Sequence, residues 1–140
     1  YAKNMIAIAN EKKAEGNVEN ATFTVAVIED MEPEVEKYDA VLALNIIHLL
    51  EDKPAALAKI HGMLKPNGYF ISSTPSMGKI PFQWRVLIGL FRLVGFPRFE
   101  SVSTEQLRKM IEAVGFETVE QWIPEGSMQS LFLVAQKRSG

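Results

Sequence analysis

The stretch YDAVLALNIIHLLED, residues 38–52, decides the fold class of this chain. Residues 40–46 are apolar except for Asn45, and His48 follows shortly after them. An apolar run without alternation is typical of a strand buried on both faces of a helix-covered parallel sheet, so we predict such a strand at residues 39–45. Asn45 and His48 then lie where ligands of open α/β sheets bind, outside the carboxyl end of a strand. A structural role for both, as a strand-end cap and a half-buried histidine, stays open at this point.

A helix and a further strand follow this stretch with short connections. Asp52 can cap a helix whose apolar residues recur every three or four positions, and the turn-forming KPNG of residues 65–68 ends it. YFISST, residues 69–74, has the composition of a strand. A strand, a helix and a strand in this order predict an α/β fold.

The flanking segments supply further elements. Residues 1–15 have the spacing of an amphipathic helix that Gly16 ends, and ATFTVAVI, residues 21–28, has the β-branched and aromatic composition of a strand. Ser103 and Gln106 form a capping box for a helix that Gly115 ends. Two last strands, joined by a short loop that favours an antiparallel pair, are predicted at residues 116–123 and 130–137.

The composition narrows the class of protein. The chain has 140 residues, of which 47% are hydrophobic and 23% charged, as in one ordinary globular domain. Its net charge of −2 gives no general attraction to nucleic acid. The absence of cysteine excludes disulfides and thiolate metal ligands, and no HxxxH or carboxylate spacing predicts a metal site. We expect a cytoplasmic protein, since a chain without cysteine fits a reducing compartment.

Several motifs, taken in order, resemble one family. The stretch at residues 38–52, the helix after it and LKPNGYFISST at residues 64–74 resemble the middle of class I S-adenosylmethionine-dependent methyltransferases, in which an aromatic–Asp pair opens the fourth strand and LKPGG precedes the fifth. The later AVGFE and LFLVAQK are also similar to that family. The resemblance implies a Rossmann-like sheet, mostly parallel with a terminal antiparallel pair and helices on both faces, and S-adenosylmethionine as cofactor.

One part of the family's pattern is missing from the chain. The family builds its cofactor site chiefly on a first strand with a glycine-rich turn and on an acid that ends the second strand, whereas this chain contains no GxGxG. It opens on Tyr1, without an N-cap before its first helix. The resemblance therefore implies that residues 1–140 are a single partial domain with an incomplete sheet. We expect open sheet edges, and weak or absent cofactor binding by the isolated chain.

The resemblance also assigns the candidate site residues. Val27 and Ile28, which end the predicted strand at residues 21–28, resemble the pair that flanks the adenine ring. Leu44 resembles the residue that packs near the methionine part of the cofactor. Asn45 is likewise assigned to the cofactor side, and His48 faces the methyl acceptor. His48 is the candidate catalytic base, since histidine exchanges protons near neutral pH, and a structural or substrate-lining role is the alternative.

Residues 75–100 interrupt the α/β rhythm with an apolar segment that proline and glycine punctuate. Similar methyltransferases carry variable lid elements at this position, which implies a lid over an apolar acceptor with Phe82, Trp84 and Arg85 as lid residues. A peripheral membrane contact through residues 80–99 and packing on the chain's own domain are the alternatives. A membrane-spanning helix is excluded because arginines interrupt every long apolar run.

Three functions follow from these observations. The first is methyl transfer from S-adenosylmethionine to a small apolar or amphipathic molecule. The second is a non-catalytic, methyltransferase-like binding module that pairs with another chain. The third, a nicotinamide-dependent dehydrogenase, is disfavoured because the chain has no YxxxK pair and because its last strands resemble those of methyltransferases.

Overall fold

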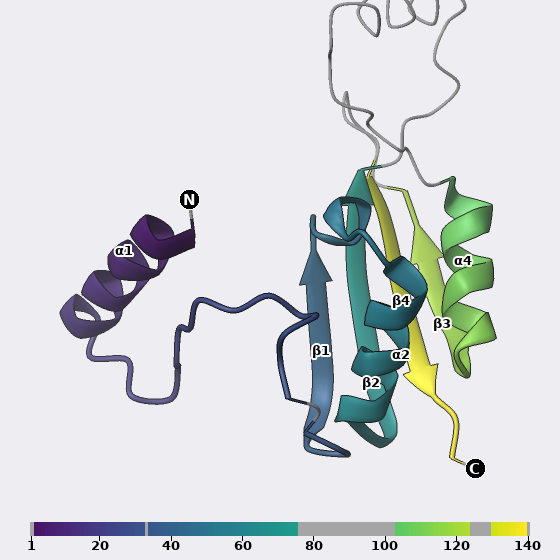
Figure 1. Ribbon diagram of the computed structural model, residues 1–140, viewed down its shortest axis with the longest axis horizontal. Helices are drawn as coiled ribbons and strands as arrows, with labels where there is room; N and C mark the ends of the chain where they lie inside the picture. Colours follow the sequence, from purple (N-terminus) through teal and green to yellow (C-terminus); the bar gives the residue numbers. More distant parts are fainter. Residues whose placement is uncertain (1, 33, 76–102, 124–129, 140) are drawn as a thin grey trace, which may run out of the picture. The chain divides into compact units, whose positions relative to one another are not determined.

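The computed structural model describes residues 2–32, 34–75, 103–123 and 130–139, and the chain divides into two compact units, Tyr1–Glu32 and Pro33–Gly140 (Figure 1). The first unit holds helix α1, Ala2–Glu15, which confirms the predicted helix. The helix ends at Gly16, and Asn17 takes the left-handed conformation with φ of 50°. Asparagine tolerates this region because its short polar side chain bonds locally.

The strand predicted at residues 21–28 is wrong. These residues form no sheet pairing, and the side chains of Phe23, Val25 and Val27 are exposed. β-Branched composition describes how well a residue fits a pleated, half-buried surface, and it does not create that surface. A strand requires a ladder partner, and residues 21–28 pair with no strand of the described sheet.

The second unit is built on a four-stranded sheet with the order β1-β2-β4-β3 (Figure 1). The β1–β2 pair is parallel, whereas β4 is antiparallel to both β2 and β3. The α/β class, the incomplete sheet and the terminal antiparallel pair are confirmed, but among the described strands parallel pairing is limited to one pair. The strands are β1 (Tyr38–Leu44), β2 (Leu64–Pro75), β3 (Phe116–Trp122) and β4 (Ser130–Lys137).

Two helices contact each other on one face of this sheet, α2 (Lys53–Met63) and α4 (Thr104–Ala113) (Figure 1). Neither covers the opposite face, so the expected helices on both faces are not found in the described part of the second unit. Asp52 caps α2 as predicted, because its Oδ1 accepts the backbone N–H of Ala55 at 2.9 Å.

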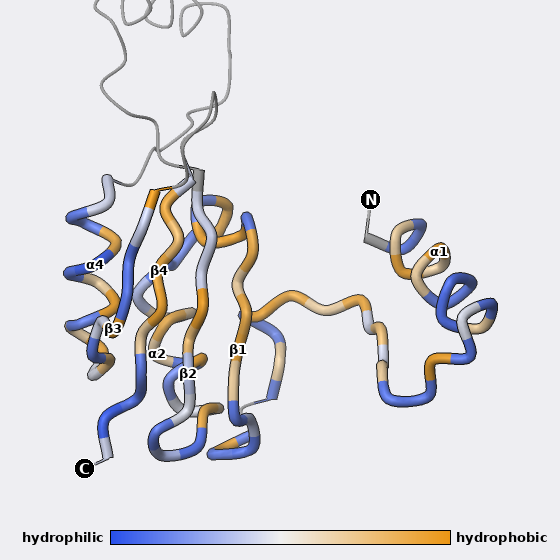
Figure 2. The backbone as a smooth tube through the Cα atoms, turned by 180° about the vertical axis from the view of Figure 1, so that it is seen from behind, coloured by the Kyte–Doolittle hydropathy of each residue, from blue (hydrophilic) through white to orange (hydrophobic). Residues whose placement is uncertain are grey.

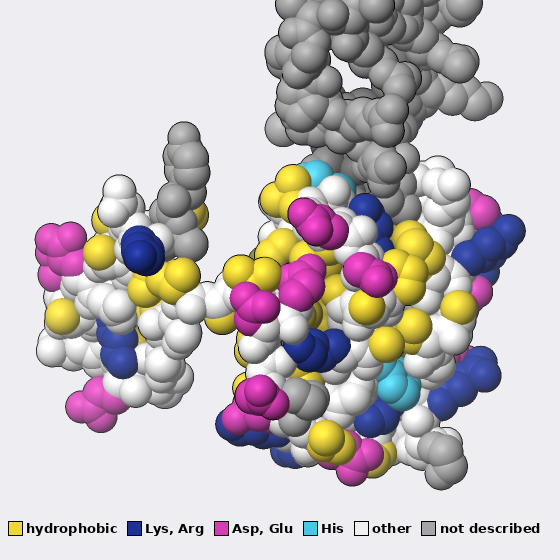
Figure 3. Space-filling model, viewed as in Figure 1, with side chains coloured by type: hydrophobic (Ala, Val, Ile, Leu, Met, Phe, Trp, Pro, Cys, Tyr) yellow, Lys and Arg dark blue, Asp and Glu magenta, His cyan; other side chains and the backbone are white. Residues whose placement is uncertain are grey.

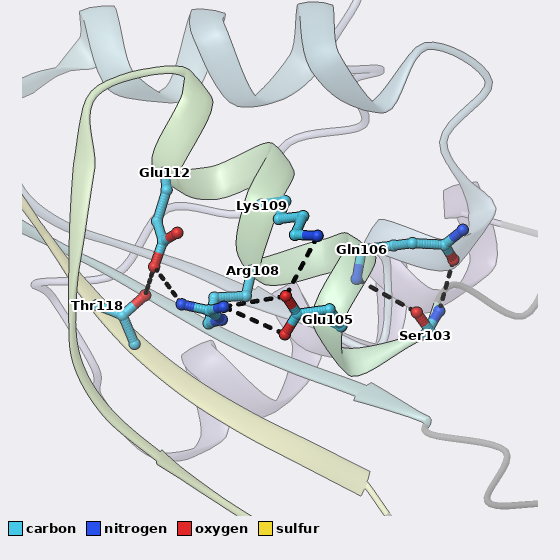
Figure 4. Close-up of polar contacts among 7 residues, drawn as sticks. All are labelled: Ser103, Glu105, Gln106, Arg108, Lys109, Glu112 and Thr118. Carbon is cyan, nitrogen blue, oxygen red and sulfur yellow. Dashed lines mark hydrogen bonds and ion pairs between the residues drawn. The ribbon is translucent and has the colours of Figure 1, made fainter.

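Helix α4 has a fully formed amino-terminal cap (Figure 4). The Ser103 hydroxyl accepts the N–H of Gln106 at 3.2 Å, and the Gln106 side chain accepts the N–H of Ser103 at 3.1 Å. On the helix surface, Arg108 donates to Glu105 and to Glu112, each at 3.0 Å. The predicted capping box is confirmed, and the helix is held by contacts between sequence neighbours.

The core lies between the two helices and the sheet. Side chains of β4 alternate between buried and half-buried, as expected for a strand with one covered face. Phe116 lies between two rings, with its centroid 5.4 Å from that of the tilted Phe70 ring and 4.9 Å from that of the edge-on His61 ring. On the helix-covered side, hydrophobic side chains lie between charged ones (Figure 3). The most deeply buried hydrophobic residues are Ile47, Leu57, Leu64, Phe70, Leu107, Ile111, Leu133 and Ala135.

The prediction that β1 is buried on both faces is wrong. It is an edge strand of the described sheet, and the side chains of Leu42 and Leu44 are 59% and 53% exposed. Figure 2 shows the sheet from the face that lacks helices and colours residues of β1 as hydrophobic. An apolar run reports which residues favour burial, whereas the neighbours of the strand decide whether burial occurs.

The KPNG segment belongs to β2 rather than to a loop before it. Asn67 is left-handed with φ of 63°, as the sequence predicts. Gly68 follows in a confined place, since a Cβ there would lie 2.9 Å from the carbonyl oxygen of Lys65 and 3.2 Å from that of Asp39. The segment therefore needs glycine because β1 and the preceding turn approach its backbone closely.

Candidate functional site at the carboxyl ends of β1 and β2

The carboxyl ends of β1 and β2 lie next to each other, because the two strands are parallel and Leu44 is in register with Ser73. Residues 44–49 leave β1 at this edge and enter the short 3-10 helix η1, Ile47–Leu49, which contacts β2. In open α/β sheets this edge is where ligands bind. The candidate site is therefore built from the last residues of β1 and β2 and from η1, and we call it the carboxyl edge.

Asn45 makes the turn out of β1. Its φ is 56°, in the left-handed region, and its backbone N–H donates to the carbonyl oxygen of Ser73 at 2.7 Å. This bond ties the start of the turn to β2, while Ile47 after it is completely buried. The side-chain amide of Asn45 is therefore exposed at the carboxyl edge. The bond to Ser73 and the burial of Ile47 hold the backbone around it in place.

Three buried polar side-chain atoms have no hydrogen-bond partner among the described residues. They are His48 Nδ1, Ser72 Oγ and Thr74 Oγ1. Most buried polar atoms in native proteins are bonded, so atoms left without a partner require an explanation such as an ordered water or a ligand. Two of the three belong to the carboxyl edge, and Ser72 lies two residues deeper along β2.

The edge also carries apolar side chains. Leu44, Ile46 and Leu49 are 53%, 46% and 65% exposed, respectively. Apolar surface beside a few convergent polar groups is the usual composition of a small-molecule site. This arrangement suits a ligand with an apolar body and a polar end.

The structure brings together some of the predicted site residues and not others. Leu44, Asn45 and His48 lie on one continuous segment of the second unit. Val27 and Ile28 belong to the first unit and do not end a strand, so their assignment to an adenine contact stays a prediction. The lid residues Phe82, Trp84 and Arg85, like nearly all of the segment at residues 75–100, lie outside the described residues, and so does the possible membrane contact at residues 80–99.

The sequence analysis missed Thr74. The available signal was the run SST at residues 72–74, in which hydroxyl side chains end a strand that is otherwise apolar and aromatic. Alternation along β2 places Ser72 and Thr74 on the same side of the sheet, in register with the buried Leu133 and Leu131 of β4.

His61 is a packing residue. It lies in α2, and its ring meets Phe116 edge-on at 4.9 Å. Burial, together with the nearby positive charge of Lys137, lowers the pKa of His61 below its ordinary value of 6.5. Its imidazole therefore favours the neutral form in the folded chain.

Two further searches of the described residues gave negative results. No three His, Asp or Glu side chains in them gather closely enough to hold a metal ion. Among the same residues, no helix has the length and apolarity that a bilayer crossing demands.

Comparisons with known proteins agree on one family. The family model described as a methyltransferase domain matches residues 1–127. No curated protein sequence matches the chain. The cyclase SpnF superposes with a TM-score of 0.76 at 15% identity over 96% of this chain and 63% of its own, so the chain spans less than two thirds of that protein.

Two further solved structures are similar. YcgJ from Bacillus subtilis has a TM-score of 0.74 at 16% identity, over 99% of this chain and 80% of its own. Magnesium protoporphyrin IX methyltransferase from Synechocystis, solved with bound S-adenosylhomocysteine, has a TM-score of 0.72 at 18% identity, over 96% of this chain and 60% of its own. At such identities each likeness establishes the fold alone. Together with the family model, these likenesses confirm the resemblance to class I S-adenosylmethionine-dependent methyltransferases, and the chain belongs to the methyltransferase domain family.

Proposed function

We propose that this chain serves S-adenosylmethionine-dependent methyl transfer to a small apolar or amphipathic acceptor. Family membership supports the reaction class, and the carboxyl edge supports the type of acceptor. The observation that carries the proposal is the coincidence, at this edge, of exposed apolar side chains with His48 Nδ1 and Thr74 Oγ1, which are buried without a partner. SpnF, a cyclase with a similar fold, shows why the fold alone does not decide the reaction.

The residues of the carboxyl edge fit one side of the cofactor. Leu44 offers an exposed apolar contact at the strand end, and Asn45 offers an amide on an anchored backbone. When bound, the cofactor supplies a methyl group on a positively charged sulfur, and in-line displacement by the acceptor leaves the carbon–sulfur electron pair on that sulfur. The work of the protein in such a reaction is chiefly proximity and alignment. Leu44 and Asn45 would provide these on the cofactor side.

His48 is the proposed base for acceptors that must lose a proton. It follows the cofactor-facing residues within one short turn, and its Nδ1 is buried and unpartnered among the described residues. Replacing it by glutamine keeps a polar side chain but removes the proton acceptor. In a form of the protein that binds the cofactor, we expect H48Q to lower kcat about 10²-fold, within the range for general base catalysis, and to leave cofactor affinity unchanged.

A binding module that pairs with another chain is the second candidate function. The observation that favours it is the exposed apolar edge strand β1, whose free backbone groups form a template for another strand. The sequence also contains no GxGxG turn. On either function we expect the isolated 140-residue chain to bind the cofactor weakly or not at all.

Ligand titration separates these candidates. Isothermal calorimetry and thermal shift with S-adenosylmethionine, S-adenosylhomocysteine and NAD would be measured on the chain and on any longer protein that contains it. Stabilisation by the two adenosyl compounds and not by NAD supports the methyltransferase. Micromolar S-adenosylmethionine binding by the isolated chain would overturn the expectation of weak binding. A response to none of the three, in every form of the protein, would favour the module.

A further inference from the structure

Thr74 is buried at a place where its hydroxyl costs stability. The residue is 2% exposed, its Oγ1 has no partner among the described residues, and its neighbour across the sheet is the buried Leu131. A hydroxyl removed from water without a hydrogen bond is destabilising, and valine would fill the same space without that cost. A hydroxyl in this position calls for a bonding partner that the described residues do not supply.

The position of Thr74 indicates where that partner binds. Leu44, the last residue of β1, is in register with Ser73, so Thr74 lies one residue beyond the end of β1 at the carboxyl edge. The Asn45 N–H bond to Ser73 holds the beginning of the 44–49 segment beside the residue that precedes Thr74. That segment carries His48, whose Nδ1 also lacks a partner among the described residues. Two independent elements therefore contribute an unsatisfied polar atom to the same edge.

The chemistry of the two atoms selects the ligand. A threonine hydroxyl and an imidazole nitrogen can each exchange a hydrogen bond with a ligand hydroxyl, and neither is an anion that would compensate an ammonium for leaving water. Of the acids that follow in the sequence, Glu51 is exposed and Asp52 is engaged in the cap of α2. The exposed Ile46 and Leu49, on the segment that carries His48, provide apolar contacts for the rest of the molecule.

We propose that Thr74 and His48 form the recognition site for the hydroxyl group of a small, neutral, amphipathic acceptor. This inference rests on the proposed function, which it deepens by naming the acceptor class. Thr74 is on this view an acceptor-contacting residue that determines specificity, and the free protein tolerates its unsatisfied hydroxyl for the sake of binding.

Ser72 provides a matched control within the same strand. It is also completely buried with an unpartnered Oγ, but it lies two residues, or about 7 Å, further from the edge. Thr74→Val and Ser72→Ala each remove one buried hydroxyl, and Thr74→Ser retains it. Urea unfolding of all three variants would first establish that each is folded.

The test is a titration of the full chain with phenol, followed by the backbone amide NMR signals, without and with saturating S-adenosylhomocysteine. We expect saturable shifts of the Thr74 and His48 signals in the wild type, about 5-fold to 10-fold weaker phenol binding in T74V, and unchanged binding in S72A and T74S. Benzylamine, a cation at neutral pH, should bind more weakly than phenol.

Several results would overturn the inference. These are the absence of Thr74 and His48 shifts in both arms, equal phenol affinity in T74V and wild type, equal losses in T74V and S72A, or tighter binding of benzylamine than of phenol. Failure of the proposed function is a different result, because it appears as missing S-adenosylhomocysteine binding in every longer protein that contains the chain, while phenol still shifts the two signals.

Discussion

Helix α4 and the carboxyl edge of β1 and β2 differ in whether their polar side chains have hydrogen-bond partners. At α4 the cap of Ser103 and Gln106 is reciprocal, and Arg108 bonds to one acid a turn before it and to another a turn after it (Figure 4). At the carboxyl edge, by contrast, His48 Nδ1 and Thr74 Oγ1 are buried without partners among the described residues. The first region satisfies itself and stabilises the fold, whereas the second leaves bonding capacity that a ligand would use.

The largest expected effect is a loss of stability from a substitution in the packed core. Phe116→Ala should lower the free energy of unfolding by about 3–5 kcal/mol, because Phe116 is 2% exposed and fills the space between Phe70 and His61. Val119→Ala, on the same strand but 57% exposed, is the control and should change stability by less than about 0.5 kcal/mol. Urea unfolding measures both, and similar effects of the two would contradict the described core.

A second prediction concerns Gly68 in the first part of β2. Gly68→Ala should cost about 1–3 kcal/mol, because its new Cβ would lie 2.9 Å from the carbonyl oxygen of Lys65. Gly62 in α2 is the matched control, since a Cβ there meets nothing within 4 Å and alanine favours a helix over glycine by about 1 kcal/mol. G68A should therefore lower the urea midpoint and G62A should raise it. A lower midpoint in G62A, or an unchanged one in G68A, would refute this account.

A third prediction compares the removal of one hydroxyl from the cap of α4 with the removal of one from the carboxyl edge. Ser103→Ala should destabilise the chain by about 1 kcal/mol, because it deletes a helix cap. Thr74→Val should be neutral or stabilising by up to about 1 kcal/mol, because it deletes an unsatisfied buried hydroxyl. Opposite signs in thermal or urea unfolding are the expected result. A loss of stability in T74V as large as that in S103A would mean that the Thr74 hydroxyl is satisfied in the free protein.

The smallest expected effect is a dependence of stability on pH. Burial and the charge of Lys137 lower the pKa of His61 in the folded chain, so protonation favours the unfolded state. The contribution of His61 is complete above the unfolded pKa near 6.5 and is lost as the pH falls through the lower pKa of the folded chain. Between pH 8 and pH 5 the free energy of unfolding should decline more steeply in wild type than in His61→Gln. Parallel profiles of the two proteins would contradict the assignment.

Local features of the chain were predictable because their causes are neighbours in sequence. The caps at Asp52 and Ser103 join residues three apart, and the left-handed Asn67 follows from what asparagine tolerates. Asn45 and His48 were identified as candidates because they are polar at the end of an apolar strand. Thr74 was missed because hydroxyl residues are common in strands. Only the structure shows that its Oγ1 is buried and has no partner among the described residues.

The sequence by itself therefore determined the helices, their caps, the parallel β1–β2 unit and the family. Tertiary structure alone decided that residues 21–28 form no strand and that β1 is exposed, because pairing and burial depend on which neighbours a segment meets. It also decided which polar atoms at the carboxyl edge lack a partner. Secondary-structure propensity depends on the residue type, whereas the hydrogen bonding of a buried polar atom depends on the groups that surround it.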